Sequence, residues 1–288
     1  MSIVSILSPD TKDLGGVNVR RLLPAQPYKM IGPFIFFDHL GPVALPSGQG
    51  IDIRPHPHIG LATVTYLFEG HLMHRDSLGS IQRIMPGDMN WMIAGRGIVH
   101  SERTADKERA AGHRLHGIQS WIALPKAHEQ AEPLFIHYPK SLLPFITVPG
   151  VRMHLIAGRA FGAEAPTEIF SDMFYISAEM SPGAEFELQP EYPERGVYVV
   201  QGEVYVDGNI IAPNHLAVLA PGRAVRIRAA ADTRVMLLGG DKLDGERIIW
   251  WNFVASSREL IEDAKHRWRA GRFPPVPGDT EFIPLPEH

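Results

Sequence analysis

A pattern of short apolar strands and glycine turns occurs twice in the chain, and this repeat restricts the fold more than any other feature. The run Thr65-Tyr-Leu-Phe-Glu-Gly70 is echoed by Val197-Tyr-Val-Val-Gln-Gly202, and both runs are rich in β-branched and aromatic residues. Strands this short, separated by turns and without helical spacing, favour an antiparallel barrel or sandwich. We therefore predict an all-β protein made of two tandem antiparallel barrels.

A proline-rich connection separates the two predicted barrels. Residues 125–150 carry prolines at positions 125, 133, 139, 144 and 149, and proline removes a backbone donor and breaks regular elements. We place the boundary here, with one domain at 1–132 and the other at 133–288.

The end of the chain predicts a short C-terminal α-helix. Ser256-Ser-Arg-Glu259 has the spacing of a capping box, in which side chains satisfy free backbone N–H groups. An apolar stripe follows at helical spacing, formed by Leu260, Ile261, Ala264 and Trp268. We expect this stripe to pack over a barrel, and we assign the helix to the domain 133–288.

Two pairs of polar side chains in the first half are candidate metal ligands. His56 with His58, and His100 with Glu102, are each spaced i and i+2, so in a strand each pair shares one face. A single histidine in a chain with 14 of them is usually a surface or core residue. The second pair matches the first, however, and if the strands are neighbours all four groups converge. Three imidazoles and one carboxylate then form a metal site.

Composition limits which chemistry this site can use. The chain has no cysteine, which excludes disulfides, zinc–thiolate sites and thiol catalysis. Imidazole and carboxylate suit Fe, Mn, Ni, Cu or Zn, and affinity order does not choose among them. The net charge of −4 gives no general attraction to nucleic acid or to an anionic membrane. No apolar run is long enough for a membrane span, and the first residues do not resemble a signal peptide. We expect a soluble, cytoplasmic protein.

The second half of the repeat lacks the ligands. Counting from the shared glycines places Leu188 and Pro190 where His56 and His58 stand in the first half. A second count, which carries the spacing from Gly95 to His100 past Gly222, places Ile227 and Ala229 where the second pair stands. Since none of these four side chains can bind a metal, we predict one ion per chain.

The remaining histidines of the first half are not expected to be ligands. His39 is assigned to supporting structure, and His71 and His74 to solvated positions beside a turn. His113 and His116, spaced i and i+3, do not fit the strand pairing of the site.

The ligand motifs resemble those of the cupin superfamily. Gly50-x5-His56-x-His58, with Gly70 twelve residues later, is similar to the first cupin motif, and Gly97-x2-His100 is similar to the second. Thr63 stands where cupins usually place a glutamate ligand, and Glu102 supplies a carboxylate from the second motif instead.

That exchange of ligands is typical of the pirins, a family of two-domain cupins. The strings 56–71 and 86–102 resemble the pirin pattern almost position by position, and the likeness extends over nearly the whole chain. One departure is Ile59, where pirins commonly carry arginine. The departure leaves the ligands intact but changes a residue expected near the mouth of the pocket.

The resemblance implies a fold and an activity. The fold is two jelly-roll cupin barrels, and the cofactor is one iron ion per chain, as Fe²⁺, held by His56, His58, His100 and Glu102. Several bacterial pirins are similar to quercetin 2,3-dioxygenases, which open the central ring of flavonols with O₂ and release carbon monoxide. In that interpretation Glu102 also accepts the flavonol proton, and Ile59, Trp91 and Met92 are pocket neighbours.

Two other functions stay open at this point. Other pirins are iron-dependent, redox-responsive regulators that act by contact with a transcription factor or a metabolic enzyme. A cupin isomerase that uses the metal as a Lewis acid is the third. The partners we expect are an aromatic small molecule and O₂, or a protein partner, without direct contact to nucleic acid or membrane. We expect a monomer.

Overall fold

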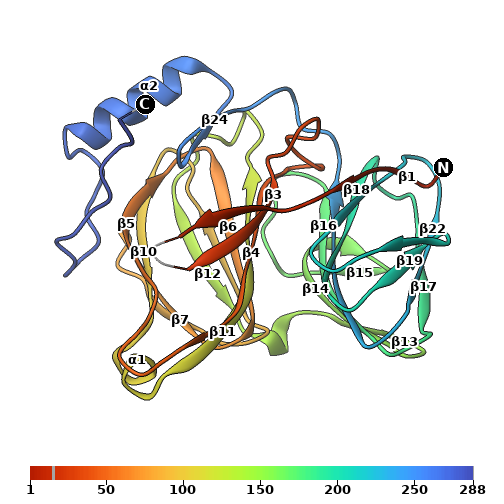
Figure 1. The fold of residues 1–288 in the computed structure, drawn as a ribbon. Helices are drawn as coiled ribbons and strands as arrows, with labels where there is room; N and C mark the ends of the chain where they lie inside the picture. Colours follow the sequence, from red (N-terminus) through yellow and green to blue (C-terminus); the bar gives the residue numbers. More distant parts are fainter. Residues whose placement is uncertain (15–16, 288) are drawn as a thin grey trace. The chain divides into compact units, whose positions relative to one another are not determined.

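The computed structural model describes residues 1–14 and 17–287, and strands dominate its secondary structure (Figure 1). The described residues divide into two compact units. The first barrel consists of Lys12–Val19, Asp38–Lys140 and Asp244–His288, and the second of Met1–Thr11, Arg20–Phe37 and Ser141–Leu243. The predicted all-β fold with two cupin barrels and a short C-terminal helix is confirmed.

The two ends of the chain are exchanged between the barrels, unlike the predicted division at 132/133. Strand β1 (Ile3–Leu7) pairs with β21 (Leu216–Leu219), which places the first residues in the second barrel. The last 45 residues, from Asp244 onward, belong to the first barrel. Both differences arise from pairings between residues far apart in sequence, which no local pattern shows.

A large and a small antiparallel sheet build the first barrel. The large sheet has the order β12 (Leu134–Tyr138), β9 (Met89–Ile93), β6 (Leu61–Glu69), β11 (His113–Ala123), β4 (Phe34–Leu45), β3 (Asn18–Leu23) and β2 (Asp10–Asp13). The last three of these strands include residues that the division above assigns to the second barrel. The small sheet has the order β5 (Asp52–His58), β10 (Ile98–Arg103), β7 (Leu72–Asp76) and β8 (Ile81–Ile84). Apolar residues of both sheets, among them Leu40, Leu67 and Leu72, pack together in the barrel core.

The second barrel repeats this plan. Its large sheet has the order β1, β21, β18 (Glu194–Gln201), β23 (Thr233–Gly240), β16 (Met173–Met180), β14 (Val151–Ala160) and β13 (Phe145–Val148), with β15 (Ala163–Glu164) beside β14. Its small sheet has the order β17 (Glu185–Leu188), β22 (Val225–Ala229), β19 (Val204–Val206) and β20 (Asn209–Ile211). An apolar cluster drawn from both sheets fills its interior.

The C-terminal segment covers part of the first barrel. It contains the hairpin β24 (Ile248–Trp250) and β25 (Phe253–Ala255), followed by the helix α2 (Arg258–Arg269). Figure 1 shows this segment, in blue, close to β5, and Ile59 forms a bridge with Phe253. The buried residues Ile261 and Ala264 of the predicted stripe pack into the same apolar cluster as Ile59.

The helix α2 begins one residue later than the predicted capping box requires. Ser257 is the N-cap, and its side chain accepts a hydrogen bond from Leu260 N at 3.4 Å. The Ser256 hydroxyl instead donates a hydrogen bond to Glu129 Oε1 at 2.6 Å, and Glu129 is a buried residue of the first barrel. The tertiary contact with Glu129 therefore shifts the cap by one position.

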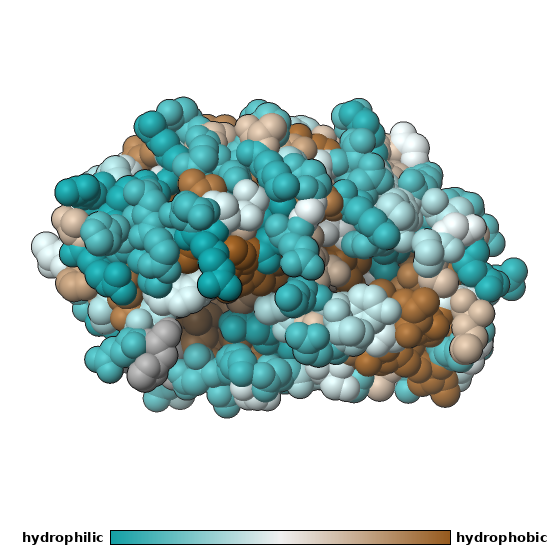
Figure 2. Space-filling model, turned by 90° about the horizontal axis from the view of Figure 1, so that it is seen from above, coloured by the Kyte–Doolittle hydropathy of each residue, from teal (hydrophilic) through white to brown (hydrophobic). Residues whose placement is uncertain are grey.

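The other two helical turns of the described residues are short. They are α1 (Asp106–Ala111) and the 3₁₀ turn η1 (Lys140–Leu142). In the face shown in Figure 2, hydrophilic residues predominate and hydrophobic residues appear in separate patches. Within residues 1–14 and 17–287, no helix is long and apolar enough to cross a membrane.

Candidate metal centre

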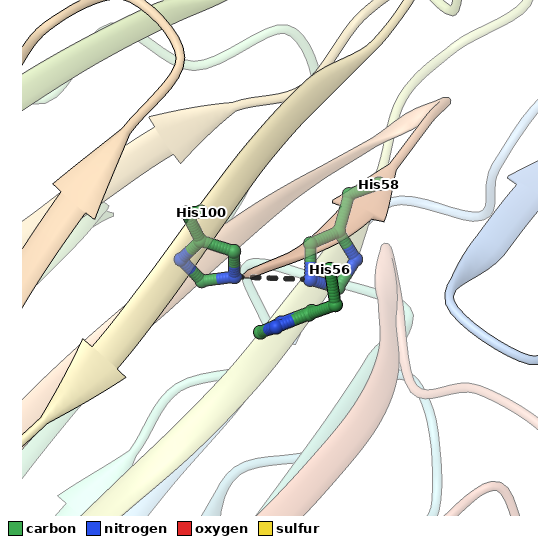
Figure 3. Close-up of side chains that lie close together, drawn as sticks. All are labelled: His56, His58 and His100. Carbon is green, nitrogen blue, oxygen red and sulfur yellow. Dashed lines mark hydrogen bonds between the residues drawn. The ribbon is translucent and has the colours of Figure 1, made fainter. Parts of the chain in front are cut away.

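Three imidazoles meet on the small sheet of the first barrel. Strands β5 and β10 are antiparallel neighbours, and His100 lies directly opposite His56. The ligand nitrogens of His56, His58 and His100 all lie within 4.8 Å of one another. Figure 3 shows the three rings pointing toward a common centre, where His58 Nε2 and His100 Nε2 are 3.1 Å apart. All three side chains are buried.

The outer nitrogens of two rings are held by backbone carbonyls. His56 Nδ1 lies 2.9 Å from the carbonyl oxygen of Arg54, and His58 Nδ1 lies 3.1 Å from that of Asn252. Because a carbonyl only accepts, both Nδ1 atoms carry the proton, and both Nε2 atoms keep a free lone pair. Metal-binding histidines are typically oriented in this way.

Burial keeps these imidazoles neutral, as metal binding requires. Burial lowers the pKa of His58 and of His100 well below the ordinary value, and the neighbouring imidazoles lower it further. Burial also lowers the pKa of His56, although its hydrogen bond to Arg54 and the charge of Glu102 act in the opposite direction.

Glu102 lies beside this group but not within it. Its side chain is buried, and its two carboxylate oxygens accept hydrogen bonds from Thr65 Oγ1 at 3.0 Å and Gln119 Nε2 at 2.9 Å. The β5–β10 register shifts between His100 and Glu102, so that Glu102 lies opposite Ile53. A β-bulge of this kind re-aims side chains, which explains why simple alternation does not place the carboxylate among the three imidazoles.

The donor set fits a divalent cation. Two imidazole nitrogens bound to one ion at about 2.0–2.1 Å lie about 3.0–3.4 Å apart, and the separation of His58 Nε2 from His100 Nε2 is 3.1 Å. Within the described chain, Glu102 forms no ion pair with lysine or arginine. A buried carboxylate without a counter-charge is costly, and a cation held by the neighbouring imidazoles would offset that cost.

A third pair of polar residues, which the sequence analysis missed, lies on the adjacent strand β7. We predicted that His74 is solvated, which is wrong: its side chain is buried and its Nε2 lies 3.0 Å from Asp76 Oδ2. Burial alone would raise the pKa of Asp76, but hydrogen bonds from His74 and from the Ser80 N–H outweigh it and lower that pKa. The signal was present, because His74-x-Asp76 has the same i, i+2 spacing as the other two pairs.

The cavity beside Glu102 is small and mainly apolar. Its volume is about 20 Å³, roughly the room of one water molecule. Asp38, Thr65, Glu102 and Gln119 form its polar side. Its apolar side is formed by Leu14, Val19, Leu40, Ile51, Ile53, Leu67, Leu72 and Ile118.

The predicted pocket neighbours Ile59, Trp91 and Met92 do not line this cavity. Each of the three side chains is 1% exposed and packs elsewhere in the fold. Ile59 packs against Phe253 of the C-terminal segment, because alternation along the chain turns it away from the face that carries His58.

The other histidines of the first barrel lie outside the group of three. His39 Nε2 and His116 Nε2 are 2.8 Å apart in the interior, as expected for supporting structure. His113 Nε2 lies 3.3 Å from Thr104 Oγ1, and His71 is half-buried.

The corresponding positions of the second barrel hold no metal-binding side chain. Leu188, Ile227 and Ala229 are part of the apolar core, and Pro190 is exposed. The distance from Gly70 to Gly202 is 132 residues, so Thr63 corresponds to Arg195. The Arg195 guanidinium is fully buried and donates to the backbone carbonyls of residues 188, 189, 220 and 223. A permanent cation here disfavours binding of a second one.

Comparison with known proteins identifies relatives of this chain. The pirin family model matches residues 16–122, and the model of the pirin C-terminal cupin domain matches residues 175–274. A pirin-like protein of Caulobacter vibrioides is 48% identical over 280 residues, which cover 96% of each chain. A candidate quercetin 2,3-dioxygenase of Pseudomonas aeruginosa is 38% identical over 260 residues, covering 89% of this chain and 80% of the other.

A solved structure extends the likeness to the fold. Quercetin 2,3-dioxygenase from Acinetobacter baumannii superposes with a TM-score of 0.92 at 32% identity, covering 99% of this chain and 96% of the other. The likeness in sequence and the likeness in fold each extend over nearly the whole chain, and the two family models match one segment in each half. The chain therefore belongs to the pirin family.

Proposed function

We propose that the protein is an iron-dependent dioxygenase that opens the central ring of a flavonol with O₂ and releases carbon monoxide. The observation that carries the proposal is the group of three buried, neutral imidazoles whose Nε2 atoms converge next to a buried carboxylate. The similarity to the Acinetobacter baumannii quercetin 2,3-dioxygenase supports the flavonol as the substrate class.

The residues of this chain have separate roles in the proposed reaction. His56, His58 and His100 would hold the ion, and the Glu102 carboxylate, which lies beside them, would turn toward the ion as the fourth ligand. Bound iron supplies Lewis acidity toward a substrate oxygen and redox chemistry toward O₂. Glu102 accepts the proton of the flavonol 3-hydroxyl on a carboxylate oxygen. In the structure Thr65 and Gln119 each donate a hydrogen bond to that carboxylate.

The apolar side chains around Glu102 exclude water, but they also leave little room. A drug-sized ligand needs a pocket of about 300–1,000 Å³, whereas the cavity here has about 20 Å³. A flavonol therefore enters only if lining side chains move away from Glu102.

Oxygen consumption tests the proposal directly. The protein is loaded with Fe²⁺ without oxygen and then mixed with quercetin and O₂, while O₂ uptake and carbon monoxide release are measured. We expect equal amounts of both, and loss of both in His56→Ala. His137→Ala is the matched control, because His137 bonds to Asn90 and not to the three imidazoles. Iron-loaded protein that consumes no O₂ with any flavonol would refute the proposal.

The small cavity favours a second candidate function, an iron-dependent regulator that binds a protein partner and turns over no substrate. In that case the ion would control the conformation around β5 and β10. Iron-loaded and metal-free protein would then retain different partners in a pull-down, and no flavonol would stimulate O₂ uptake. Equal retention by both forms would count against this candidate.

A further inference from the structure

The pair His74 and Asp76 belongs to the same face of the small sheet as the three imidazoles. Strand β7 is the neighbour of β10, with His74 opposite Glu102 and Asp76 opposite His100. His74 is 2% exposed and Asp76 is 0% exposed. Three pairs spaced i and i+2 thus lie on three neighbouring strands, and the proposed reaction uses only two of them.

His100 differs from the other two imidazoles in the partner of its outer nitrogen. Carbonyl oxygens accept from His56 Nδ1 and His58 Nδ1, so each of these tautomers is fixed by one contact. The partner of His100 Nδ1 is another imidazole nitrogen, His74 Nδ1, at 3.4 Å. Because an imidazole nitrogen either donates or accepts, this contact alone leaves the tautomer of His100 undetermined.

The tautomer of His100 is determined by Asp76, which is the next residue in the series of hydrogen bonds after His74. Asp76 Oδ1 accepts from the backbone N–H groups of Leu78, at 2.9 Å, and Ser80, at 3.0 Å. Its Oδ2 lies 3.0 Å from His74 Nε2, and an ionised carboxylate only accepts, so His74 Nε2 carries the proton. His74 Nδ1 is then an acceptor, and His100 Nδ1 must donate to it. The lone pair of His100 Nε2 is left free for a metal.

We propose that Asp76, acting through His74, is the positioning residue that holds His100 in its metal-binding tautomer. The His74 ring stacks on Phe135, with ring centroids 4.2 Å apart and planes at 12°, which keeps it oriented between its two partners. The inference rests on the proposed metal site. It adds a series of hydrogen bonds that runs from Asp76 through His74 to His100, the ligand of the ion.

The substitution Asp76→Asn reverses the direction of each hydrogen bond between Asp76, His74 and His100, and it keeps the shape of the side chain. The two backbone N–H groups require the amide oxygen at the Oδ1 position, so the amide NH₂ takes the Oδ2 position and faces His74 Nε2. His74 must then accept at Nε2 and donate from Nδ1 to His100. This transfers the proton of His100 to Nε2, where a ligand needs its lone pair.

Metal affinity and the position of the His100 proton test the inference. Isothermal titration with Zn²⁺ should show a dissociation constant about 10–100-fold weaker for Asp76→Asn than for the wild type, the range typical of partners behind a metal ligand. Imidazole ¹⁵N shifts of the metal-free proteins should place the His100 proton on Nδ1 in the wild type and on Nε2 in Asp76→Asn.

A double-mutant cycle separates this role from simple support of the 76–80 turn. His74→Phe interrupts this series of hydrogen bonds and can still stack on Phe135, so Asp76→Asn should cause no further loss of affinity in that background. The control is Asp88→Asn. Like Asp76, Asp88 accepts a hydrogen bond from a backbone N–H, that of Lys140, and its other oxygen faces a histidine, His137, which is not one of the three imidazoles. Its affinity for Zn²⁺ should stay at the wild-type value.

The outcomes distinguish failure of the inference from failure of the proposed site. If the wild type binds no Zn²⁺, or His56→Ala binds it equally well, the proposed metal site is wrong and the inference falls with it. If the wild type binds and Asp76→Asn binds equally tightly, the site stands and the inference is refuted. The inference is also refuted if the double variant loses Zn²⁺ affinity by the product of the two single losses, from Asp76→Asn and from His74→Phe.

Discussion

Acidification should destabilise the metal-free protein, because His58 and His100 are buried in neutral form. Burial lowers the pKa of both well below 6.5 in the folded state. In the unfolded chain both titrate near about 6.5, so below that pH the unfolded state binds protons that the folded state does not. The stability present above pH 6.5 is therefore lost as the pH falls, until the folded-state pKa values are reached.

The size of the effect follows from two imidazoles. Each imidazole that stays neutral in the fold lowers the free energy of unfolding by about 1.4 kcal/mol per pH unit below its unfolded pKa. For the two imidazoles together, the free energy of unfolding falls by about 3 kcal/mol between pH 7.5 and pH 5.5. A typical domain has a free energy of unfolding of about 5–15 kcal/mol, so a loss of this size is readily measured.

Urea unfolding followed by circular dichroism, on protein treated with a chelator, measures this loss at the two pH values. The matched variant is His58→Gln combined with His100→Gln, which keeps every other titrating group. Its free energy of unfolding should fall by about 3 kcal/mol less than that of the wild type over the same pH interval. An equal fall in both proteins would show that these imidazoles do not stay neutral in the fold.

Three further predictions concern the site and its support. Glu102→Gln should keep the fold, since an amide can pair with both Thr65 and Gln119, but O₂ uptake with a flavonol should fall about 10²–10⁴-fold; wild-type turnover in the iron-loaded variant would remove Glu102 from the reaction. Elemental analysis should give one metal ion per chain, and two would contradict the loss of ligands from the second barrel. Phe253→Ala should lower the free energy of unfolding by about 3–5 kcal/mol, because the ring is fully buried in the C-terminal cluster; unchanged urea unfolding would contradict this packing.

Local spacing predicted the part of the site that depends on local geometry. The i, i+2 pattern of His56 and His58 places both rings on one face of β5, and the structure has them there. The position of Glu102 depends on a bulge, which the spacing does not show. His74 was missed because it lies close to the turn at 76–79, and turn residues suggested solvation. In the structure its ring stacks on Phe135, which is 61 residues away.

Long-range contacts explain the differences in the fold. The repeat at Gly70 and Gly202 was sufficient to predict two barrels, since each barrel forms around its own apolar strands. The exchange of the chain ends depends instead on pairings such as Leu7 with Leu216. The shift of the helix cap by one residue depends on Glu129, which holds Ser256 outside the helix.

The contact between His58 and Asn252 has a consequence for the synthesis of this protein. Asn252 follows the last histidine of the group, His100, by 152 residues, the difference between 252 and 100. A ribosome that adds about 5–20 residues per second needs about 8–30 s for that distance. Throughout this interval the nascent chain carries all three imidazoles without the carbonyl that orients His58. The fully oriented set of nitrogens exists only after translation has passed residue 252.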